Sequence, residues 1–461
     1  MYDFAIIGSG VSGARIAYEL TAGGAKCVMI EAGRKFDRHS YPRGELGYST
    51  QMFWGGGIEI THDGRIGLLR GKCLGGTSVI NQADLNRFDD SAWDDWRQRS
   101  GIRYFQAADI DPLYDHLDEV VISGPIPRQH YNRNAELFIK ALDQAGFSWR
   151  GITRSQTDCR LDQGTDCIVC LGGCPRDAKQ SALITVIPAA VEQGLRIETE
   201  FEIHSLEHAN DAVRIRGIQN GGQRELIAAK AVLAAGVLGN VKILNQSPRI
   251  AASLPALGTG FCCHPQYMMY ACFRDPVDAH KGALQSVESH DERIRAAGVK
   301  FENVYAPPIA TAMLMPGIRG RHLASMKKYR YMASMEVAVR DEPAGRIKLS
   351  KKGRLIVDKP LTDQDRRRMR YGWTLLAELL WSTGPQELIQ CGHPYGLHLM
   401  GGCPIGTDPK RSVVGPDFRI HGQRNLYAAD SSIFPSAPGI NPSFTIMALS
   451  YKAAHEMLAE R

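Results

Sequence analysis

The strongest constraint on the fold is a glycine-rich turn that directly follows the first apolar run of the chain. Residues 4–7 form that run, and Gly8, Gly10 and Gly13 complete a GxGxxG pattern. Apolar residues at helical spacing follow, and a second apolar run at residues 27–30 closes the unit. A strand, a tight turn, a helix and a second strand in this order predict a βαβ unit that binds a dinucleotide.

Each residue of this motif has a separate physical task. Gly8 permits the turn, Gly10 lets backbone amides approach a pyrophosphate, and Gly13 lets the helix pack close to the strand. Glu31, which ends the second strand, can accept hydrogen bonds from the hydroxyls of an unphosphorylated ribose. The motif by itself does not distinguish FAD from NAD.

The composition is that of an ordinary soluble enzyme. Hydrophobic residues make up 44% and charged residues 23% of the 461 residues, and no apolar run approaches the ~20 residues that cross a bilayer. The net charge of +6 is modest, and the arginine-rich segment 366–370 is typical of a solvated helix face. These features predict two or three domains, no membrane span and no nucleic-acid partner.

The N-terminus and the cysteines indicate the compartment. The first strand begins at Tyr2, which leaves no room for an export signal. The chain has 11 cysteines, an odd number that favours reduced thiols over disulfides. We therefore expect a cytoplasmic protein.

The C-terminal region carries two polar residues in glycine-rich surroundings. His398 is followed by Leu-Met-Gly-Gly-Cys, and a predicted strand over residues 426–429 ends at Asp430. Asn441 precedes a proline and is the expected cap of a final helix over residues 442–458. Taken singly, His398 is more typical of a buried core position than of catalysis. Asn441 by itself is likewise more typical of a helix cap or a turn.

Two further motifs lie between these ends. An apolar run at residues 232–236 ends in Ala-Ala-Gly. Residues 72–81 hold the other motif, with Gly75, Gly76, Ser78 and Asn81. In this order and spacing the motifs resemble those of the glucose-methanol-choline (GMC) flavoproteins. The segment after His398 is most similar to that of bacterial cholesterol oxidase.

The resemblance implies an α/β fold. A Rossmann-like FAD-binding domain, of the type shared with p-hydroxybenzoate hydroxylase, is expected at residues 1–90, 180–260 and 391–461. An inserted substrate domain on an antiparallel sheet is expected at residues 91–179 and 261–390. The implied FAD contacts are Gly8, Gly10, Gly13, Glu31, Gly75, Gly76, Ser78, Asn81, Ile203, Ala235, Gly236, Asp430 and Asn441.

The implied reaction is the FAD-dependent oxidation of a small-molecule alcohol to a carbonyl compound. It removes a hydroxyl proton and sends a hydride from carbon to the flavin N5. The resemblance gives His398 the role of base, because imidazole titrates near neutral pH. Asn441 is implied to orient the substrate oxygen, since its amide can donate to a developing alkoxide. His264 also matches a family position, but no chemistry is assigned to it.

Two positions depart from the family pattern. Some members attach the flavin covalently through a histidine at the position of Ile80, so FAD is expected to bind non-covalently here. Asp84 stands where the family usually has a small or apolar residue. Either its carboxylate meets a polar or cationic group of the substrate, or it faces solvent.

The cysteine loop 159–174 is a candidate metal site. Cys167, Cys170 and Cys174 precede a proline with the spacing C-x2-C-x3-C-P, and Cys159 lies upstream. The run resembles part of a ferredoxin ligand set and the cysteine segment of iron-sulfur-containing GMC dehydrogenases. An iron-sulfur cluster, a zinc ion and a structural loop without metal are all compatible with the spacing.

The middle of the chain predicts the substrate domain. Residues 332–339 are expected as a strand, residues 346–349 and 354–357 as a hairpin on the same sheet, and residues 363–381 as a helix. Four apolar residues could line a pocket, but core packing is the better interpretation. These four are Phe301, Tyr305, Met313 and Met315.

Several alternatives stay open at this stage. The electron acceptor could be oxygen, a quinone or a redox protein, and a dehydrogenase could pass electrons through an iron-sulfur cluster. A flavoprotein of the same fold that oxidises no alcohol is also compatible, although pure electron transfer needs neither His398 nor Asn441. The sequence indicates neither the alcohol nor the oligomeric state.

The absence of a histidine at position 80 generates the first prediction. Acid precipitation of the purified protein is expected to release a yellow supernatant, because the Ile80 side chain has no nitrogen to which a flavin can attach. The measurement is the visible absorbance of the supernatant. Flavin that stays in the protein pellet would contradict non-covalent binding.

Overall fold

The glycine-rich turn lies at the predicted place in the computed structural model, which describes residues 1–157, 159 and 170–460. β1 (Tyr2–Ile7) leads into the turn, α1 (Val11–Ala22) follows it, and β2 (Cys27–Ile30) pairs in parallel with β1. Gly8 has φ +110°, and a Cβ there would lie 2.1 Å from the Ala234 carbonyl oxygen. The predicted βαβ unit is confirmed. Glycine suits position 8 because it tolerates the positive φ and leaves room for the Ala234 carbonyl.

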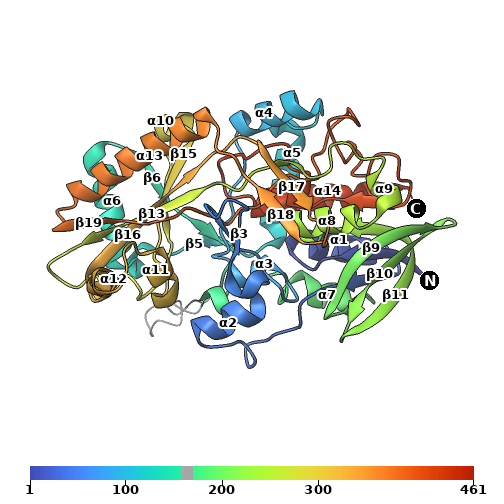
Figure 1. The fold of residues 1–461 in the computed structure, drawn as a ribbon, viewed down its shortest axis with the longest axis horizontal. Helices are drawn as coiled ribbons and strands as arrows, with labels where there is room; N and C mark the ends of the chain where they lie inside the picture. The colour runs from blue at the N-terminus through green and yellow to red at the C-terminus, as the bar shows by residue number, and fades with distance from the viewer. Residues whose placement is uncertain (158, 160–169, 461) are drawn as a thin grey trace.

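The βαβ unit belongs to a seven-stranded sheet. The parallel strands are β8 (Arg196–Glu198), β2, β1, β11 (Gly222–Leu233) and β21 (Leu426–Ala428). β10 (Ala212–Gln219) and β9 (Phe201–Ala209) extend the sheet as an antiparallel meander. Helices α7 (Val186–Glu192) and α14 (Ser443–Ala459) pack against α1, and α8 (Gly236–Asn245) packs against β9. Both termini lie at this end of the molecule (Figure 1).

A second, nine-stranded sheet lies at the opposite end of the long axis (Figure 1). All its pairings are antiparallel except that of β20 with β4. Its strands are β3 (Glu59–Ile60), β4 (Gly67–Leu68), β20 (Tyr395–Gly396), β13 (Gln266–Cys272), β16 (Met332–Val339), β15 (Val299–Asn303), β14 (Val287–Ser289), β6 (Trp149–Gly151) and β19 (Glu387–Gln390). The inserted antiparallel sheet expected from the family resemblance is therefore present.

Two helices cover part of this sheet. α13 (Asp363–Ser382) and α6 (Arg133–Ala145) pack against its strands, and Thr362 starts α13 with a capping box to Asp365. Every residue of β16 is buried, so this strand is covered on both faces. The predicted strand and helix are confirmed, but β16 lacks the alternation of buried and exposed residues expected for a half-exposed strand.

The predicted hairpin forms, but on a different sheet. β17 (Gly345–Leu349) and β18 (Leu355–Asp358) pair with each other and with β12 (Thr259–Phe261) in a separate three-stranded sheet. Ile347 and Val357 are buried in the same apolar core as the seven-stranded sheet. The placement of the hairpin on the substrate sheet was wrong, because local alternation reveals a hairpin but not the surface on which it packs.

The remaining elements lie between these sheets, and two of them, β5 (Gly124–Pro125) and β7 (Thr153–Arg154), pair as a separate two-stranded sheet. The others are α2 (Glu45–Met52), η1 (Trp54–Gly57), α3 (Thr77–Ile80), α4 (Asp90–Ser100), α5 (Ala107–Val120), η2 (Arg128–His130), α9 (Pro248–Ala251), α10 (Glu292–Ala296), α11 (Pro308–Leu314), α12 (Gly320–Met326), η5 (Tyr329–Tyr331) and η6 (Ser431–Ile433). Among the residues that the structure describes, no helix is both long and apolar enough to cross a membrane.

The apolar residues of the middle region pack mainly into cores. Phe301 is buried between the nine-stranded sheet and its helices, and Tyr305 and Met315 belong to a neighbouring cluster. Met313 is 61% exposed on α11 and packs in neither cluster. Core packing is confirmed for three of the four candidates.

The two glycines at the start of the GxGxxG turn generate the second prediction. Gly8→Ala is expected to lower the apparent Tm of the cofactor-free protein by roughly 5 °C or more, because its Cβ would clash with the Ala234 carbonyl at an unfavourable φ. Gly10→Ala is the matched control, since a Cβ there would meet no atom within 4 Å. The measurement is thermal unfolding followed by circular dichroism. Equal Tm values for the two variants would contradict the assigned role of Gly8.

Candidate active site

The first two glycine motifs lie against each other. The Gly75 backbone N–H donates to Ser9 Oγ at 2.9 Å, and a Cβ on Gly76 would lie 2.8 Å from the Gly10 Cα. Gly10 itself borders open space directly before α1, so the helix N-terminus is accessible to an anion. A Cβ on Gly13 would lie 2.0 Å from the Gly8 carbonyl oxygen, which confirms the close packing of helix and strand.

Glu31 joins the turn to the end of β2. Its buried carboxylate accepts from Gly33 N at 2.8 Å, Ser9 N at 3.2 Å and Ser9 Oγ at 2.6 Å. Burial raises the pKa of Glu31. A carboxylate has about four acceptor positions, so one is left for a ribose hydroxyl. Phe201 N donates to the Glu31 carbonyl at 3.0 Å, and this places Ile203 on β9 near the same end.

The third predicted cofactor segment meets Asp430 at the carboxyl ends of two parallel strands. Gly236 N donates to Asp430 Oδ2 at 2.7 Å, and Asn240 Nδ2 donates to Asp430 Oδ1 at 3.0 Å. Asn240 Oδ1 in turn accepts from Ala235 N at 3.0 Å. Burial raises the pKa of Asp430. The turns after β11 and β21 are therefore held together by one buried carboxylate, and Asn240 was missed by the sequence analysis.

The residues after the second glycine motif are also tied down. Ser78 Oγ donates to the Gly75 carbonyl at 2.6 Å, and Asn81 Oδ1 accepts from Ala83 N at 3.0 Å. Ile80 is 4% exposed. Open space at Gly10, the spare acceptor position of Glu31 and the joined glycine motifs fit a dinucleotide cofactor.

His398 faces His264 across an antiparallel bridge. Cys262 and Met400 form this bridge. His264 follows Cys262 by two residues and His398 precedes Met400 by two, so an antiparallel pairing places the histidines opposite each other. The two Nδ1 atoms are 3.1 Å apart, and the rings are at 89° to each other. The Nε2 atom of His264 accepts from the Gly439 backbone N–H at 2.8 Å. His264 therefore connects His398 to the loop that leads to Asn441.

These contacts determine the tautomers of both rings. Burial lowers the pKa of His264 well below its usual value, and burial together with the charge of Lys300 lowers the pKa of His398 to about 3. Both rings are neutral near pH 7. Because Nε2 of His264 accepts from Gly439, its proton lies on Nδ1 and donates to Nδ1 of His398. The proton of His398 then lies on Nε2.

A polar network holds His264 in place. His264 has φ +47°, and its backbone N–H donates to Asp341 Oδ1 at 2.9 Å. Asp341 also pairs with Lys359 at 2.9 Å, and both side chains have 0% exposure. An unusual backbone angle is maintained here by a fully buried ion pair.

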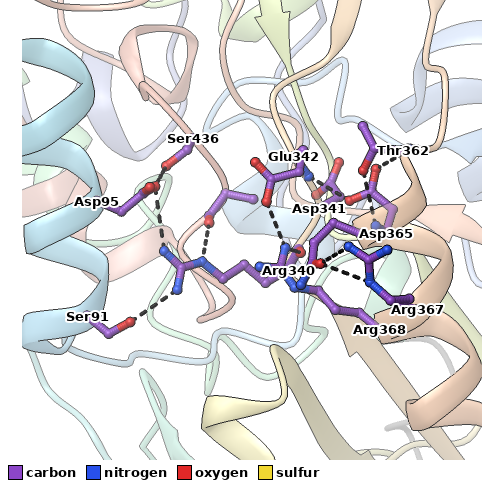
Figure 2. A network of polar contacts seen from close by, with 12 residues as sticks. Ser91, Asp95, Arg340, Asp341, Glu342, Thr362, Asp365, Arg367, Arg368 and Ser436 are labelled. Carbon is purple, nitrogen blue, oxygen red and sulfur yellow. Dashed lines mark hydrogen bonds and ion pairs between the residues drawn. The ribbon is translucent and has the colours of Figure 1, made fainter.

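The neighbours of Asp341 extend this network to other segments (Figure 2). Arg340 Nε donates to the Ala437 carbonyl at 3.3 Å, and its guanidinium lies 3.5 Å from Asp95 on α4. Glu342 accepts from Arg368 of α13 at 3.0 Å. Arg368 is thus turned inward, whereas the other arginines of segment 366–370 are exposed. Residues 340–342 therefore hold His264 and the loop before Asn441 together.

Asn441 does not cap the final helix. α14 begins at Ser443 with Pro442 at its N-cap, and no side chain caps it. The predicted cap role was wrong, because the Asn441 side chain is engaged elsewhere. Its Oδ1 accepts from Lys300 Nζ at 2.7 Å, and its Nδ2 donates to Asp84 Oδ2 at 3.4 Å.

Asp84 is buried beside Asn441. It is 8% exposed, so the alternative in which it faces solvent is wrong. Burial, and then the charge of Glu302, raise the pKa of Asp84 to about 7. Arg154 lies 3.8 Å from Asp84 Oδ1 and moderates this shift. Asp84 therefore adds a titratable group to the site near neutral pH.

The cysteine loop gains no support as a metal site. Cys167 lies outside the described residues, and Cys170 and Cys174 are partly exposed. Cys159 Sγ lies 3.1 Å from Gln156 Oε1. Within the described part of the chain, no group of three or more histidine, cysteine or acidic side chains is arranged to hold a metal ion.

The sequence analysis missed the residues that connect the site. The sequence points to His264, because it precedes a proline at a family position, but that pattern does not predict the contacts of its ring. It does not point to Lys300, Asp341 or Lys359, because only strand pairing and burial bring them to the site.

Comparisons with known proteins point to one family. Two models of the GMC oxidoreductase family match residues 49–266 and 341–450. An uncharacterized GMC-type oxidoreductase of Sinorhizobium fredii is 27% identical, over 99% of this chain and 94% of its own. A long-chain-alcohol oxidase of Arabidopsis thaliana is 24% identical, over 97% of this chain and 66% of its own. The crystal structure of pyridoxine 4-oxidase from Mesorbium loti has a TM-score of 0.75 at 17% identity, over 99% of each chain.

Proposed function

The chain belongs to the GMC oxidoreductase family, and on this premise we propose that it oxidises an alcohol to a carbonyl compound with non-covalently bound FAD. The family resemblance and the α/β fold class predicted from sequence are confirmed. The division into FAD-binding and substrate domains given above is part of the proposal. The observation that carries it is the convergence of His398 and the Asn441 loop on His264.

The glycine motifs support the FAD assignment. Gly10 and the α1 N-terminus would hold the pyrophosphate, Glu31 the ribose, and Gly75 and Gly76 the middle of the cofactor. Asp430 would support the cofactor indirectly, because its oxygens already accept hydrogen bonds from Gly236, Asn240 and Ser432 and so hold these segments in place. When bound, FAD supplies the acceptor for the hydride that leaves the alcohol carbon.

His398 is the proposed acceptor of the hydroxyl proton. Its neutral ring at working pH is a requirement for that role. In the tautomer shown here, however, Nε2 of His398 carries a proton and can only donate. We therefore include a tautomer exchange in the proposal. In this exchange the Gly439 N–H releases His264 Nε2, and the Nδ1 proton of His264 passes to Nδ1 of His398. The Nε2 proton of His398 returns through solvent to Nε2 of His264, so both rings stay neutral and Nε2 of His398 is free to accept the hydroxyl proton.

The exchange has its own spectroscopic test. Imidazole nitrogens that carry a proton differ in ¹⁵N chemical shift from those that do not. With ¹⁵N-labelled histidine, we expect the His398 Nε2 signal to move to the unprotonated range when an unreactive substrate analogue binds. A His398 Nε2 that stays protonated would leave His398 as a donor and overturn its role as base.

Asn441 is the proposed second contact to the substrate oxygen. One Nδ2 hydrogen faces Asp84, and the other is available to donate to the oxygen as it gains negative charge. An amide keeps this donor at every pH between about 2 and 12, because it does not titrate there. His398 and Asn441 thus divide proton acceptance and charge stabilisation between them.

The substrate is proposed only as an alcohol. The Arabidopsis relative acts on long-chain alcohols by its name, and this supports oxidation at a CH–OH group without identifying the alcohol. Asp84 is kept as a proposed determinant of substrates with a polar or cationic group, because its carboxylate lies beside Asn441. An Asp84→Ala variant with unchanged KM for every substrate would remove that proposal.

The central prediction concerns reduction of the bound flavin. In an anaerobic screen, at least one alcohol is expected to bleach the flavin absorbance. His398→Ala should slow the bleaching about 10²- to 10⁴-fold and Asn441→Ala about 10²- to 10³-fold, because a proton acceptor and a charge-stabilising donor are lost. Stopped-flow absorbance measures the rates.

The same loop supplies the matched control. His393 is exposed and lies on the chain just before β20, so His393→Ala should bleach at the wild-type rate. Bleaching of His398→Ala at the wild-type rate would overturn the assigned role of His398. A flavin that no alcohol reduces would overturn the proposed function.

A further inference from the structure

Lys300 lies on β15 with its side chain 11% exposed, and it contacts three oxygen atoms. Nζ is 2.7 Å from Asn441 Oδ1, 2.5 Å from Glu288 Oε2 and 2.6 Å from Glu302 Oε1. An ammonium group has three N–H donors and no acceptor. Lys300 therefore donates one hydrogen bond to Asn441 and forms ion pairs with two buried acids.

The hydrogen bond from Lys300 determines the orientation of the Asn441 amide. The two ends of an amide are similar in shape, so packing distinguishes them poorly. Because an ammonium can only donate, the atom that faces Lys300 must be Oδ1 and not Nδ2. Nδ2 is then on the far side, where Asp84 Oδ2 accepts at 3.4 Å.

We infer that Lys300 is a positioning residue for the proposed oxidation, and that its ammonium decides which end of the Asn441 amide faces the substrate oxygen. This inference rests on the proposed function. A flipped amide would present Oδ1, which repels a developing alkoxide and donates no hydrogen bond. The Lys300 ammonium therefore leaves the Nδ2 end of Asn441 to donate to the substrate oxygen.

The position of Lys300 is itself fixed by the sheet. Glu288 and Glu302 are directly paired across β14 and β15, and Glu302 is paired with Glu336 across β15 and β16. Gln285 donates to Glu302 Oε2 at 2.7 Å, and Arg150 donates to Glu288 Oε1 at 2.6 Å. Both acids that hold the ammonium are therefore held from their other side.

The protonation states agree with this geometry. Burial by itself lowers the pKa of Lys300, but its contacts with Glu288 and Glu302 outweigh burial and raise it above the usual value. Burial likewise opposes ionisation of Glu288, but Lys300 and Arg150 lower its pKa. The ammonium is charged at every pH at which the enzyme would be assayed.

The decisive experiment is a double-mutant cycle on the FAD-loaded protein. Lys300→Met by itself leaves Glu302 without its cation and Glu288 with Arg150 alone, which could unfold the protein. The test therefore uses Lys300→Met/Glu302→Gln, which removes one cation and one acid together. The rate of anaerobic flavin reduction is expected to fall roughly 100-fold, with a much smaller change in the apparent Kd of the alcohol.

A comparison with Asn441→Ala distinguishes a positioning role of Lys300 from a general disturbance of the structure, because the two losses of rate should not add if Lys300 acts through Asn441. In an Asn441→Ala background, Lys300→Met/Glu302→Gln should cause little further loss of rate, because the group on which Lys300 acts is gone. Lys452→Met, which breaks an ion pair with Glu456 on α14, is the control and should keep the wild-type rate. An unchanged rate in the Lys300 variant, or a loss that adds fully to that of Asn441→Ala, would overturn the inference while the oxidation itself stands.

A second measurement does not depend on turnover. With ¹⁵N-labelled asparagine, the Nδ2 protons of Asn441 can be identified by their absence in Asn441→Ala. Two separate proton signals are expected in the wild type, and exchange-broadened or shifted signals in the Lys300 variant. Unchanged signals would refute the role of Lys300 even if no alcohol reduced the flavin, so failure of the inference and failure of the proposed function are distinguishable.

Discussion

The candidate site depends on the two ring hydrogen bonds of His264. One reaches His398, and the other reaches Gly439 on the loop before Asn441. A histidine ring has only two nitrogens, so both are used to join segments far apart in the sequence. The ring can do so only because Asp341, neutralised by Lys359, accepts from the His264 backbone at an unfavourable φ. Together these contacts hold His398 close to the loop that carries Asn441.

The interior next to this site is unusually polar for a sheet core. Glu288, Glu302 and Glu336 lie in register on three neighbouring strands, and Lys300 forms ion pairs with the first two. Burial and the charge of Glu302 raise the pKa of Glu336 well above its usual value. A buried charge is stable only while its partners are present. The network is therefore best understood as a unit that fixes polar groups in defined orientations at a cost in stability.

Much of the fold could be predicted because its signals are local. The GxGxxG turn, the strand at 332–339 and the helix from Asp363 follow from spacings within a few residues, and the structure confirms each. The hairpin at 345–358 was recognised but assigned to the wrong sheet. Alternation specifies which faces of a hairpin are apolar, but several apolar surfaces in one protein can accept such a face. Asn441 was misread as a cap for a related reason, since an asparagine before a proline has the same local pattern whether or not its side chain bonds to the helix.

The sequence by itself determined the family, the dinucleotide turn and the choice of His398 and Asn441, because these depend on short motifs in a particular order. Tertiary structure decided what those residues can do. The tautomer of His398 follows from a bond between His264 and Gly439, and the amide orientation of Asn441 follows from Lys300. Lys300 lies 141 residues before Asn441 in the chain. Hydrogen bonds of this kind act over about 3 Å and carry no sequence spacing, so only the packed fold can reveal them.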